Sequence, residues 1–258
     1  MGRVDPLERY SRQMLVSQLG REGQEKLRAA RVGLVGCGAL GSVIAGHLVR
    51  AGVGFLRMID SDHAELTNLH RQSLYTEDDV ARRVPKAEAA LAHLREINSD
   101  VTLEALVARL SQDTLPSFAG GLDLLVDGTD NFATRFLIND YAVAHCLPWI
   151  YGGVVGTSGM SMTVVPGDGP CLRCLVRDLP GPGQDLTANT AGVINTIVGV
   201  IGSIEATEVM KLIVDPAARS RQLLVVDVWD LAFERLDVPR DPDCPCCGGV
   251  NGRLGGCQ

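Results

Sequence analysis

A glycine-rich turn near the start of the chain constrains the fold more than any other feature of the sequence. Gly36, Gly38 and Gly41 form a G-x-G-x-x-G pattern between an apolar run, 31–35, and a predicted helix. Such glycines allow a tight turn and a close approach of the backbone to phosphate, and the N-terminus of the helix favours anions. Asp60 follows Gly41 by nineteen residues, at the end of the next predicted strand, where its carboxylate can accept hydrogen bonds from a ribose. The pattern therefore predicts a nucleotide-binding site.

Strands and helices alternate over the first 155 residues, which is typical of an α/β, doubly wound, mostly parallel Rossmann-like sheet. The strands expected up to residue 165 are 31–35, 55–59, 103–108, 122–126, 149–155 and 160–165. The expected helices are 7–19, 23–30, 86–98 and 132–145, together with the helix that follows the glycine turn. Two later runs, 222–228 and 233–238, have no helix between them, so we expect antiparallel strands to extend the sheet.

The composition is that of a globular protein with a sizeable core, because 46% of the residues are apolar and 21% are charged. A formal net charge of −7 gives a nucleic-acid or anionic-membrane partner no broad electrostatic support. Residues 1–12 are too charged for a signal peptide, and the apolar stretch 191–204 is too short to span a bilayer. We therefore expect a cytoplasmic protein that binds neither nucleic acid nor membrane.

Polar segments follow the predicted strands where an ordinary dinucleotide-binding fold would continue into its next helix. Arg71 lies in the segment 68–72, Lys86 begins a helix, and Asp130 follows a strand. Because the carboxyl ends of strands in a doubly wound sheet line one crevice, these three side chains are expected to meet at the nucleotide. The two cations suit the oxygens of a triphosphate, and the carboxylate suits Mg²⁺. NAD binding requires neither the metal ion nor two cations directed at phosphate. The alternatives are three solvated loop charges, or an NAD-dependent oxidoreductase that uses only the glycine turn and Asp60.

Two CxxC pairs, separated by 69 residues, predict a metal site. The four cysteines are Cys171, Cys174, Cys244 and Cys247. Four thiolates form a closed tetrahedral Zn²⁺ site with no open position, so the metal is expected to be structural. Disulfides are the alternative, which a reducing compartment disfavours. Cys246 is a possible substitute ligand by sequence, Cys37 and Cys146 are expected to be small buried side chains, and Cys257 is expected to be an exposed thiol.

Five short motifs occur in a fixed order along the chain. They are Arg9-Tyr-Ser-Arg12-Gln, Gly36-Cys-Gly-Ala-Leu-Gly41, Asn68-Leu-His-Arg-Gln72, Pro85-Lys86 and Gly128-Thr-Asp-Asn131. Together they resemble the MoeB/ThiF/HesA family of adenylyltransferases, the bacterial relatives of ubiquitin-activating enzymes. The likeness runs from Arg9 to Cys247 and is closest in pattern to molybdopterin-synthase adenylyltransferase. Ala39 stands where the family usually has glycine.

The resemblance implies ATP-dependent adenylation of the C-terminal glycine of a small ubiquitin-like (β-grasp) sulfur-carrier protein with a Gly-Gly end. It implies ATP and Mg²⁺ as cofactors, structural Zn²⁺ on the four cysteines, and an external sulfur donor. Catalysis would fall to Arg71, Lys86, Asp130 and Arg12, the last reaching across a homodimer into the partner's site. The implied nucleotide-binding residues are Gly36, Gly38, Ala39, Gly41, Asp60, Asp62, Asn68, Arg71, Gln72, Lys86, Asp130 and Asn131.

The resemblance also implies one adenylation domain, 1–247, followed by a flexible tail, 248–258. Residues 5–30 would form a helical arm, and residues 31–155 would form the nucleotide-binding core. Residues 156–247 would form the carrier-binding region, with the crossover loop and the two CxxC zinc knuckles. Relatives that form a thioester or persulfide carry a cysteine shortly before an Ala-Gly-Val, where this chain has Ala188. No cysteine lies between Cys174 and Cys244, so we expect adenylation without a covalent enzyme–carrier intermediate. A non-catalytic carrier-binding scaffold is the alternative.

Overall fold

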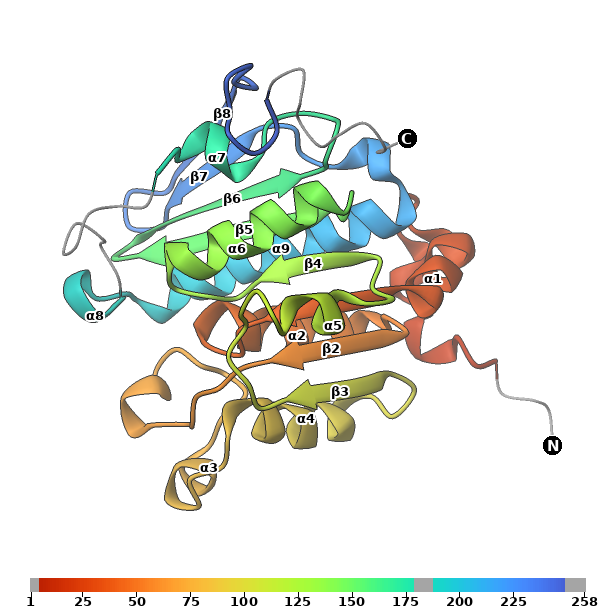
Figure 1. Cartoon of the computed structure of the whole chain (residues 1–258). Helices are drawn as coiled ribbons and strands as arrows, with labels where there is room; N and C mark the ends of the chain where they lie inside the picture. Colours follow the sequence, from red (N-terminus) through yellow and green to blue (C-terminus); the bar gives the residue numbers. More distant parts are fainter. Residues whose placement is uncertain (1–4, 179–187, 249–258) are drawn as a thin grey trace.

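The computed structural model describes residues 5–178 and 188–248, and in this part the chain forms one eight-stranded sheet (Figure 1). The strand order is β3-β2-β1-β4-β5-β6-β7-β8. The strands are β1 Arg31–Val35, β2 Phe55–Ile59, β3 Thr102–Leu106, β4 Leu124–Asp127, β5 Trp149–Val155, β6 Ser158–Val164, β7 Leu223–Asp227 and β8 Ala232–Leu236. Strands β1 to β5 are parallel and β6 to β8 are antiparallel. The predicted fold class is confirmed.

Helices cover both faces of the sheet (Figure 1). One face carries α1 Gly20–Ala29, α2 Ala39–Ala51, α4 Lys86–Ile97 and α9 Asn195–Val214. The other carries α5 Leu115–Ala119, α6 Phe132–Ala144 and α7 Leu172–Leu175. The short helices α3 Glu77–Ala81 and α8 Ala188–Ala191 lie in connections, as do the 3₁₀ turns Glu8–Tyr10, Gln13–Leu15, Leu66–Asn68 and Pro216–Ala218. No helix in the described ranges is long and apolar enough to cross a membrane.

Two hydrophobic cores lie on the two faces of the sheet. Because consecutive side chains of a strand point to opposite faces, β4 contributes to both cores. Leu124 and Val126 pack in the core that contains α2, α4 and α9, whereas Leu125 packs in the core that contains α5, α6 and the cysteines of α7. Strands that are buried on both faces read as near-continuous apolar runs, and for this reason β1, β2, β4 and β5 were predictable within two residues of their observed bounds. The edge strand β3 was predicted as closely, although its Thr102 and Glu104 are exposed.

The N-terminal arm differs from its prediction as a helix over 7–19. It contains two 3₁₀ turns, and the first α-helix begins at Gly20. Leu7 and Tyr10 of the arm are buried, and the Tyr10 hydroxyl accepts a hydrogen bond from Asn98 Nδ2 at 2.8 Å. The Tyr10 ring packs against Gly52, which has φ 81°. A Cβ on Gly52 would lie 2.4 Å from that ring, so this position requires glycine. A tertiary contact, rather than helix propensity, therefore shapes the arm.

Helix α9 was not predicted as a helix. Its 20 residues include most of the apolar stretch 191–204, and they contact α1, α2, β5 and β6. A helix that packs on several sides lacks the one-sided apolar stripe that marks a surface helix, so the sequence carries little periodic signal. Most of the polar crossing segment, 179–187, and the tail from 249 with Cys257 lie outside the described residues.

Candidate functional site

The turns that follow β1 and β4 pack against each other, backbone to backbone. Gly36, at φ 87°, donates its N–H to Ile59 O at 2.9 Å, and Gly128 donates its N–H to Val35 O at 2.7 Å. A Cβ on Gly128 would lie 2.5 Å from Gly36 O, and a Cβ on Gly41 would lie 2.0 Å from that oxygen. Glycine is therefore sterically required here, and the open N-terminus of α2 stands directly above the turn.

Asp60 lies directly after β2 and faces the glycine turn. Its carboxylate accepts hydrogen bonds from the Cys37 N–H at 2.7 Å and from the Asp62 N–H at 2.8 Å. Burial raises the pKa of Asp60, while these two N–H groups and Lys86 oppose that shift. Tyr75 joins the turn to α4, because its hydroxyl lies 2.6 Å from Cys37 O and 3.3 Å from Lys86 O.

Lys86, the first residue of α4, is only 7% exposed, yet its ammonium group is at the same site. Its Nζ lies 3.2 Å from Asp62 Oδ2, and its N–H donates to Asp62 O at 2.8 Å. A buried ammonium needs an anion beside it. Asp62 is largely exposed, so a second, more strongly charged anion can also approach Lys86.

The segment 68–72 packs beside the glycine turn. Asn68 and Gln72 are buried, and a Cβ on Gly38 would lie 3.8 Å from Gln72 Nε2. Gln72 Oε1 is buried with no hydrogen-bond partner in the described residues, which costs about 1–3 kcal/mol unless a ligand supplies a donor. Arg71 is half-buried, and its Nη1 donates to Thr67 O at 2.9 Å.

Asp130 and Asn131 follow β4 at the same edge of the sheet. Asn131 caps α6, because its Oδ1 accepts the Thr134 N–H at 2.9 Å. The Asp130 side chain is exposed and makes no hydrogen bond or ion pair with the part of the chain that the structure describes. Mg²⁺ is commonly held by one or two carboxylates together with substrate phosphates, and a free carboxylate at this place fits that requirement.

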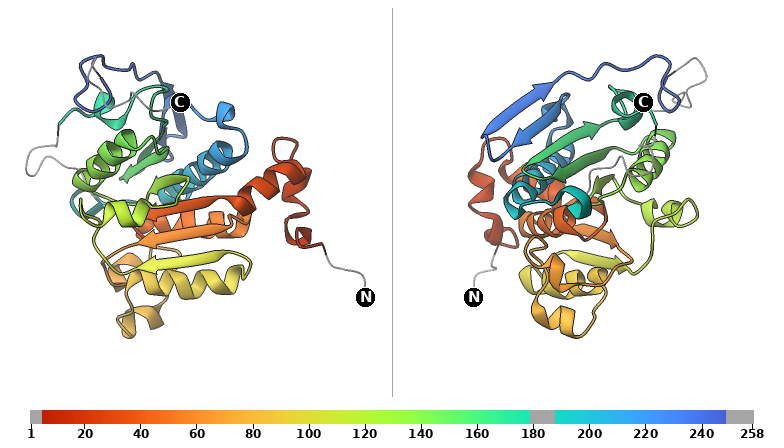
Figure 2. Two further views of the ribbon diagram at one scale, coloured as in Figure 1. Left: turned by 45° about the vertical axis from the view of Figure 1, so that its right-hand side comes forward. Right: turned by 90° about the vertical axis from the view of Figure 1, so that its left-hand side faces the viewer.

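Arg12 does not join the other residues. The carboxyl ends of β1 to β4 point to one edge of the sheet, whereas the arm lies at the opposite edge, beside α1 (Figures 1 and 2). The anchors of the arm, Gly52 and Asn98, precede β2 and β3, and a strand of five residues is roughly 16 Å long. The Arg12 side chain is exposed and has no partner within residues 5–178 and 188–248.

Three charged residues beneath the site were missed by sequence reasoning. Asp127, Arg135 and Glu205 are buried, and Arg135 Nε donates to Asp127 Oδ2 at 2.9 Å. Neither carboxylate oxygen of Glu205 has a hydrogen-bond partner in the described ranges, and a Cβ on Gly152 would lie 2.3 Å from Glu205 Cδ. Burial, and then the charge of Asp127, raise the pKa of Glu205 well above its ordinary value. The sequence signal that could have found Glu205 is its position, as a glutamate inside an otherwise apolar run.

Glu205→Gln is expected to flatten the pH dependence of stability. The folded wild type keeps the Glu205 proton, whereas the unfolded chain loses it above a pKa of about 4.5. The wild type therefore loses about 1.4 kcal/mol per pH unit from this group as pH rises from 4.5 towards the folded pKa, and Glu205→Gln does not. Urea unfolding at pH 5, 6, 7 and 8 measures the difference. Parallel profiles for the two proteins would show that Glu205 ionises normally in the fold.

The four predicted zinc ligands meet in one cluster. The sulfur atoms of Cys171, Cys174, Cys244 and Cys247 all lie within 4.8 Å of one another. The distances Cys171–Cys244 and Cys174–Cys247 are 3.6 and 3.4 Å, close to the about 3.8 Å between sulfurs on a tetrahedral zinc ion. The cluster can hold such an ion.

Helix α6 anchors the first knuckle of this cluster. Asn139 Oδ1 accepts the Leu172 N–H at 2.9 Å, and Arg173 donates two hydrogen bonds of 2.7 Å to Asp140. Cys246 lies next to the cluster, 3.3 Å from Asn139 Nδ2. Cys37 is buried as predicted, but Cys146 is exposed after α6 and disulfide-bonded, so the prediction of a small buried side chain is wrong there.

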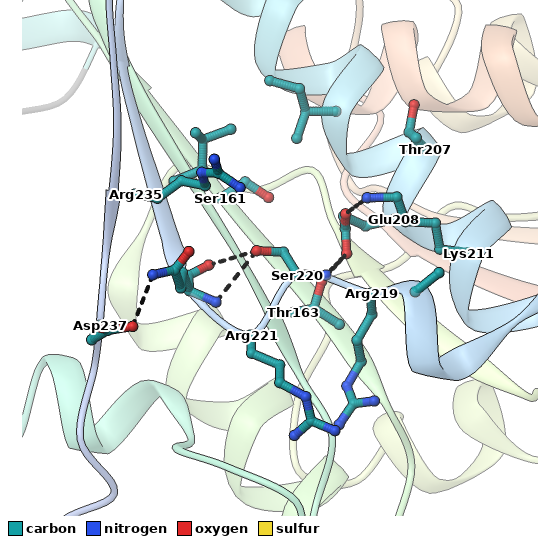
Figure 3. A pocket seen from close by; sticks show the side chains of 14 residues that line it. Ser161, Thr163, Thr207, Glu208, Lys211, Arg219, Ser220, Arg221, Arg235 and Asp237 are labelled. Carbon is teal, nitrogen blue, oxygen red and sulfur yellow. Dashed lines mark hydrogen bonds and ion pairs between the residues drawn. The ribbon is translucent and has the colours of Figure 1, made fainter.

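A hollow of about 710 Å³ lies away from this site, over β6, β7 and the C-terminal half of α9 (Figure 3). Ser161 and Thr163 line it, and they pair with Gly152 and Ile150 towards the amino-terminal half of β5. Several of its charged side chains are paired: Lys211 pairs with Glu208 at 2.6 Å, and Arg219 and Arg221 pair with Asp168. None of its lining residues belongs to the predicted nucleotide site.

Residues 10–246 match the ThiF family. The chain belongs to the ThiF family. Relatives in this family include the SAMP-activating enzyme E1 of Haloferax volcanii, which is 41% identical over 94% of this chain and 89% of its own. The sulfur carrier protein ThiS adenylyltransferase of Bacillus subtilis is 42% identical over 93% of this ThiF-family chain and 71% of its own. These relatives support adenylation over the NAD-dependent alternative.

A solved structure shares the ThiF-family fold seen here. MccB of Escherichia coli, crystallised with ATP, superimposes with a TM-score of 0.81 and 25% sequence identity. The match covers 95% of this chain and 75% of the MccB chain. The sheet with its parallel and antiparallel parts is therefore an architecture on which ATP binding is known.

Proposed function

We propose that this chain, an adenylyltransferase of the ThiF family, uses ATP to adenylate the C-terminal glycine of a small β-grasp sulfur-carrier protein. The observation that supports this proposal most is the convergence of the glycine turn, Asp60, Lys86, Gln72 and Asp130 at one edge of the sheet. Relatives named for the activation of SAMP and ThiS suggest the class of substrate. A carboxylate of the carrier would attack the α-phosphate and displace pyrophosphate.

In this proposal the site positions charges rather than moving protons. The N-terminus of α2 and Lys86 would receive phosphate oxygens, Asp60 a ribose hydroxyl, and Asp130 the magnesium ion that neutralises the phosphates. Arg71 would turn from Thr67 O towards the phosphates when ATP binds. No general base is needed, because the attacking carboxylate is already ionised at neutral pH. Asn68, Asp62 and Asn131 would support these groups.

Arg12 would act in the site of a second copy of the chain. It lies at the edge of the sheet opposite its own nucleotide site and has no partner of its own among the described residues. Leu15 and Val16, beside it on the arm, are exposed, as expected of a segment that packs against another chain. We therefore propose a homodimer with two composite sites.

The carrier would dock on the antiparallel part of the sheet. The hairpin of β7 and β8 carries three exposed apolar side chains. Trp229 and Leu231 have exposed fractions of 77% and 79%, and Phe233 is also exposed. Isolated exposed apolar side chains are ordinary, but several together mark an interaction surface. From this surface the flexible C-terminus of a carrier could run to the carboxyl ends of the parallel strands.

The proposed activity is tested by ATP–pyrophosphate exchange. Exchange of labelled pyrophosphate into ATP is expected only when Mg²⁺ and a carrier ending in Gly-Gly are both present. A carrier that lacks the last glycine is the matched control and is expected to give none. ATP binding without exchange for any Gly-Gly carrier would favour the non-catalytic scaffold instead.

The carrier is expected to leave without a covalent bond to the enzyme. Cys37 is buried and its pKa is raised well above the ordinary value by burial, so it is a poor nucleophile. No cysteine lies between Cys174 and Cys244, where relatives with a covalent intermediate carry one. A non-reducing gel of carrier, ATP, Mg²⁺ and enzyme, followed by mass spectrometry, is expected to show no adduct. A DTT-sensitive adduct that one cysteine substitution abolishes, Cys257→Ser first, would refute this.

A further inference from the structure

The turn between β4 and α6 is held by buried side chains as well as by the bond from the Gly128 N–H to Val35 O of β1. Asp127 Oδ1 accepts the Thr129 N–H at 2.8 Å and the Thr129 hydroxyl at 2.6 Å. Arg135 Nη2 donates to Thr129 O at 2.8 Å. All three polar groups of Thr129 are therefore bound to one buried ion pair.

The same arginine ties this turn to the neighbouring strand. Arg135 Nη2 also donates to Gly152 O of β5, at 2.9 Å. Gly152 must lack a side chain, because the Glu205 carboxyl group occupies the place where its Cβ would be. The guanidinium group thus has one carboxylate and two main-chain carbonyl groups as acceptors, and it is locked between β4, β5 and α6.

From this geometry we infer that Arg135, with Asp127, is a positioning residue that fixes the Asp130 carboxylate for its metal ion. The inference rests on the proposed function, in which Asp130 binds magnesium. Asp130 has no anchor of its own among the described residues, but Thr129 before it is held by the ion pair and Asn131 after it caps α6. Groups behind metal ligands orient those ligands and commonly alter metal affinity by about 10–100-fold.

Arg135→Lys tests the inference, because lysine keeps the charge but cannot bond the carboxylate and both carbonyl groups in one plane. Arg57→Lys is the matched control. Arg57 likewise binds one carboxylate, Glu104, and two carbonyl groups, of Phe118 and Gly120, and it lies on β2 away from the turn. Each variant replaces one planar guanidinium group by an ammonium group. If the role of Arg135 were merely structural, the two variants would have similar effects on metal binding.

The measurement is the affinity of Mn²⁺ for the enzyme–ATP complex by electron paramagnetic resonance, supported by the Mg²⁺ concentration that gives half-maximal pyrophosphate exchange. Arg135→Lys is expected to weaken Mn²⁺ binding about 10-fold, and Arg57→Lys less than about 2-fold. Unchanged Mn²⁺ affinity in Arg135→Lys, with affinity lost in Asp130→Asn, would overturn the positioning role alone. Unchanged affinity in Asp130→Asn would instead overturn the proposed metal site.

A second variant keeps the test decisive if Arg135→Lys does not fold. Thr129→Val removes the hydroxyl bond to Asp127 with almost no change in shape and leaves the ion pair intact. It is expected to weaken Mn²⁺ binding in the same direction, by a smaller factor than Arg135→Lys. Mn²⁺ affinity equal to that of the wild type in a folded Thr129→Val protein would count against the inference.

Discussion

Arg12→Ala and Asp130→Ala are each expected to be inactive, and an equimolar mixture of the two is expected to recover about a quarter of the wild-type activity. An arginine that completes a phosphate site in trans contributes about 10³-fold or more to the rate. After subunit exchange, half of the dimers contain one chain of each kind. One site of such a dimer then has an intact Asp130 facing an intact Arg12, and the other site lacks both.

Pyrophosphate exchange measures this recovery after the two proteins have been co-expressed or unfolded and refolded together. The double variant with both substitutions, mixed with Arg12→Ala, is the control and is expected to recover nothing. If Arg12 acted within its own chain, no mixture would contain an intact site, so zero recovery in a confirmed heterodimer would exclude the trans arrangement. A fully active monomer would exclude the homodimer as well.

Cys174→Ser is expected to lose zinc and to lower the melting temperature substantially. Structural zinc contributes about 10–16 kcal/mol in zinc-finger peptides, and less here because two hydrophobic cores stabilise the fold without it. A loss on the order of 4 kcal/mol would lower the melting temperature by about 8–16 °C in a chain of this size. At low temperature the KM for ATP is expected to stay unchanged, because no predicted nucleotide residue contacts the cluster.

Cys246→Ser is the matched control for the zinc ligands. Cys246 stands beside Cys247 and bonds to Asn139 at 3.3 Å, but it is not one of the four clustered thiols. Metal analysis of reduced protein is expected to find about one zinc per chain in the wild type and in Cys246→Ser. The assignment fails if the wild type contains no zinc, or if Cys246→Ser loses as much zinc as Cys174→Ser.

Local patterns explain which elements were predictable from the sequence. The inner parallel strands β1, β2, β4 and β5 are near-continuous apolar runs because both of their faces are buried. The glycine turn is visible because Gly41 cannot carry a Cβ beside Gly36 O. The arm and α9 were not predictable in this way. Tyr10 shapes the arm through a residue 88 positions away, and α9 has no one-sided apolar stripe.

The sequence by itself determined the glycine turn, the polar groups after the strands and the four cysteines that cluster in the fold. Each of these depends on residues that are close in sequence, or on a ligand type that has few other uses in a chain. Only the tertiary structure decided that Arg12 lies at the edge opposite its own site, and that Arg135 and Glu205 meet beneath the β4 turn. Those arrangements depend on contacts between distant segments, and burial of a charge is a property of the packed fold that no short pattern encodes.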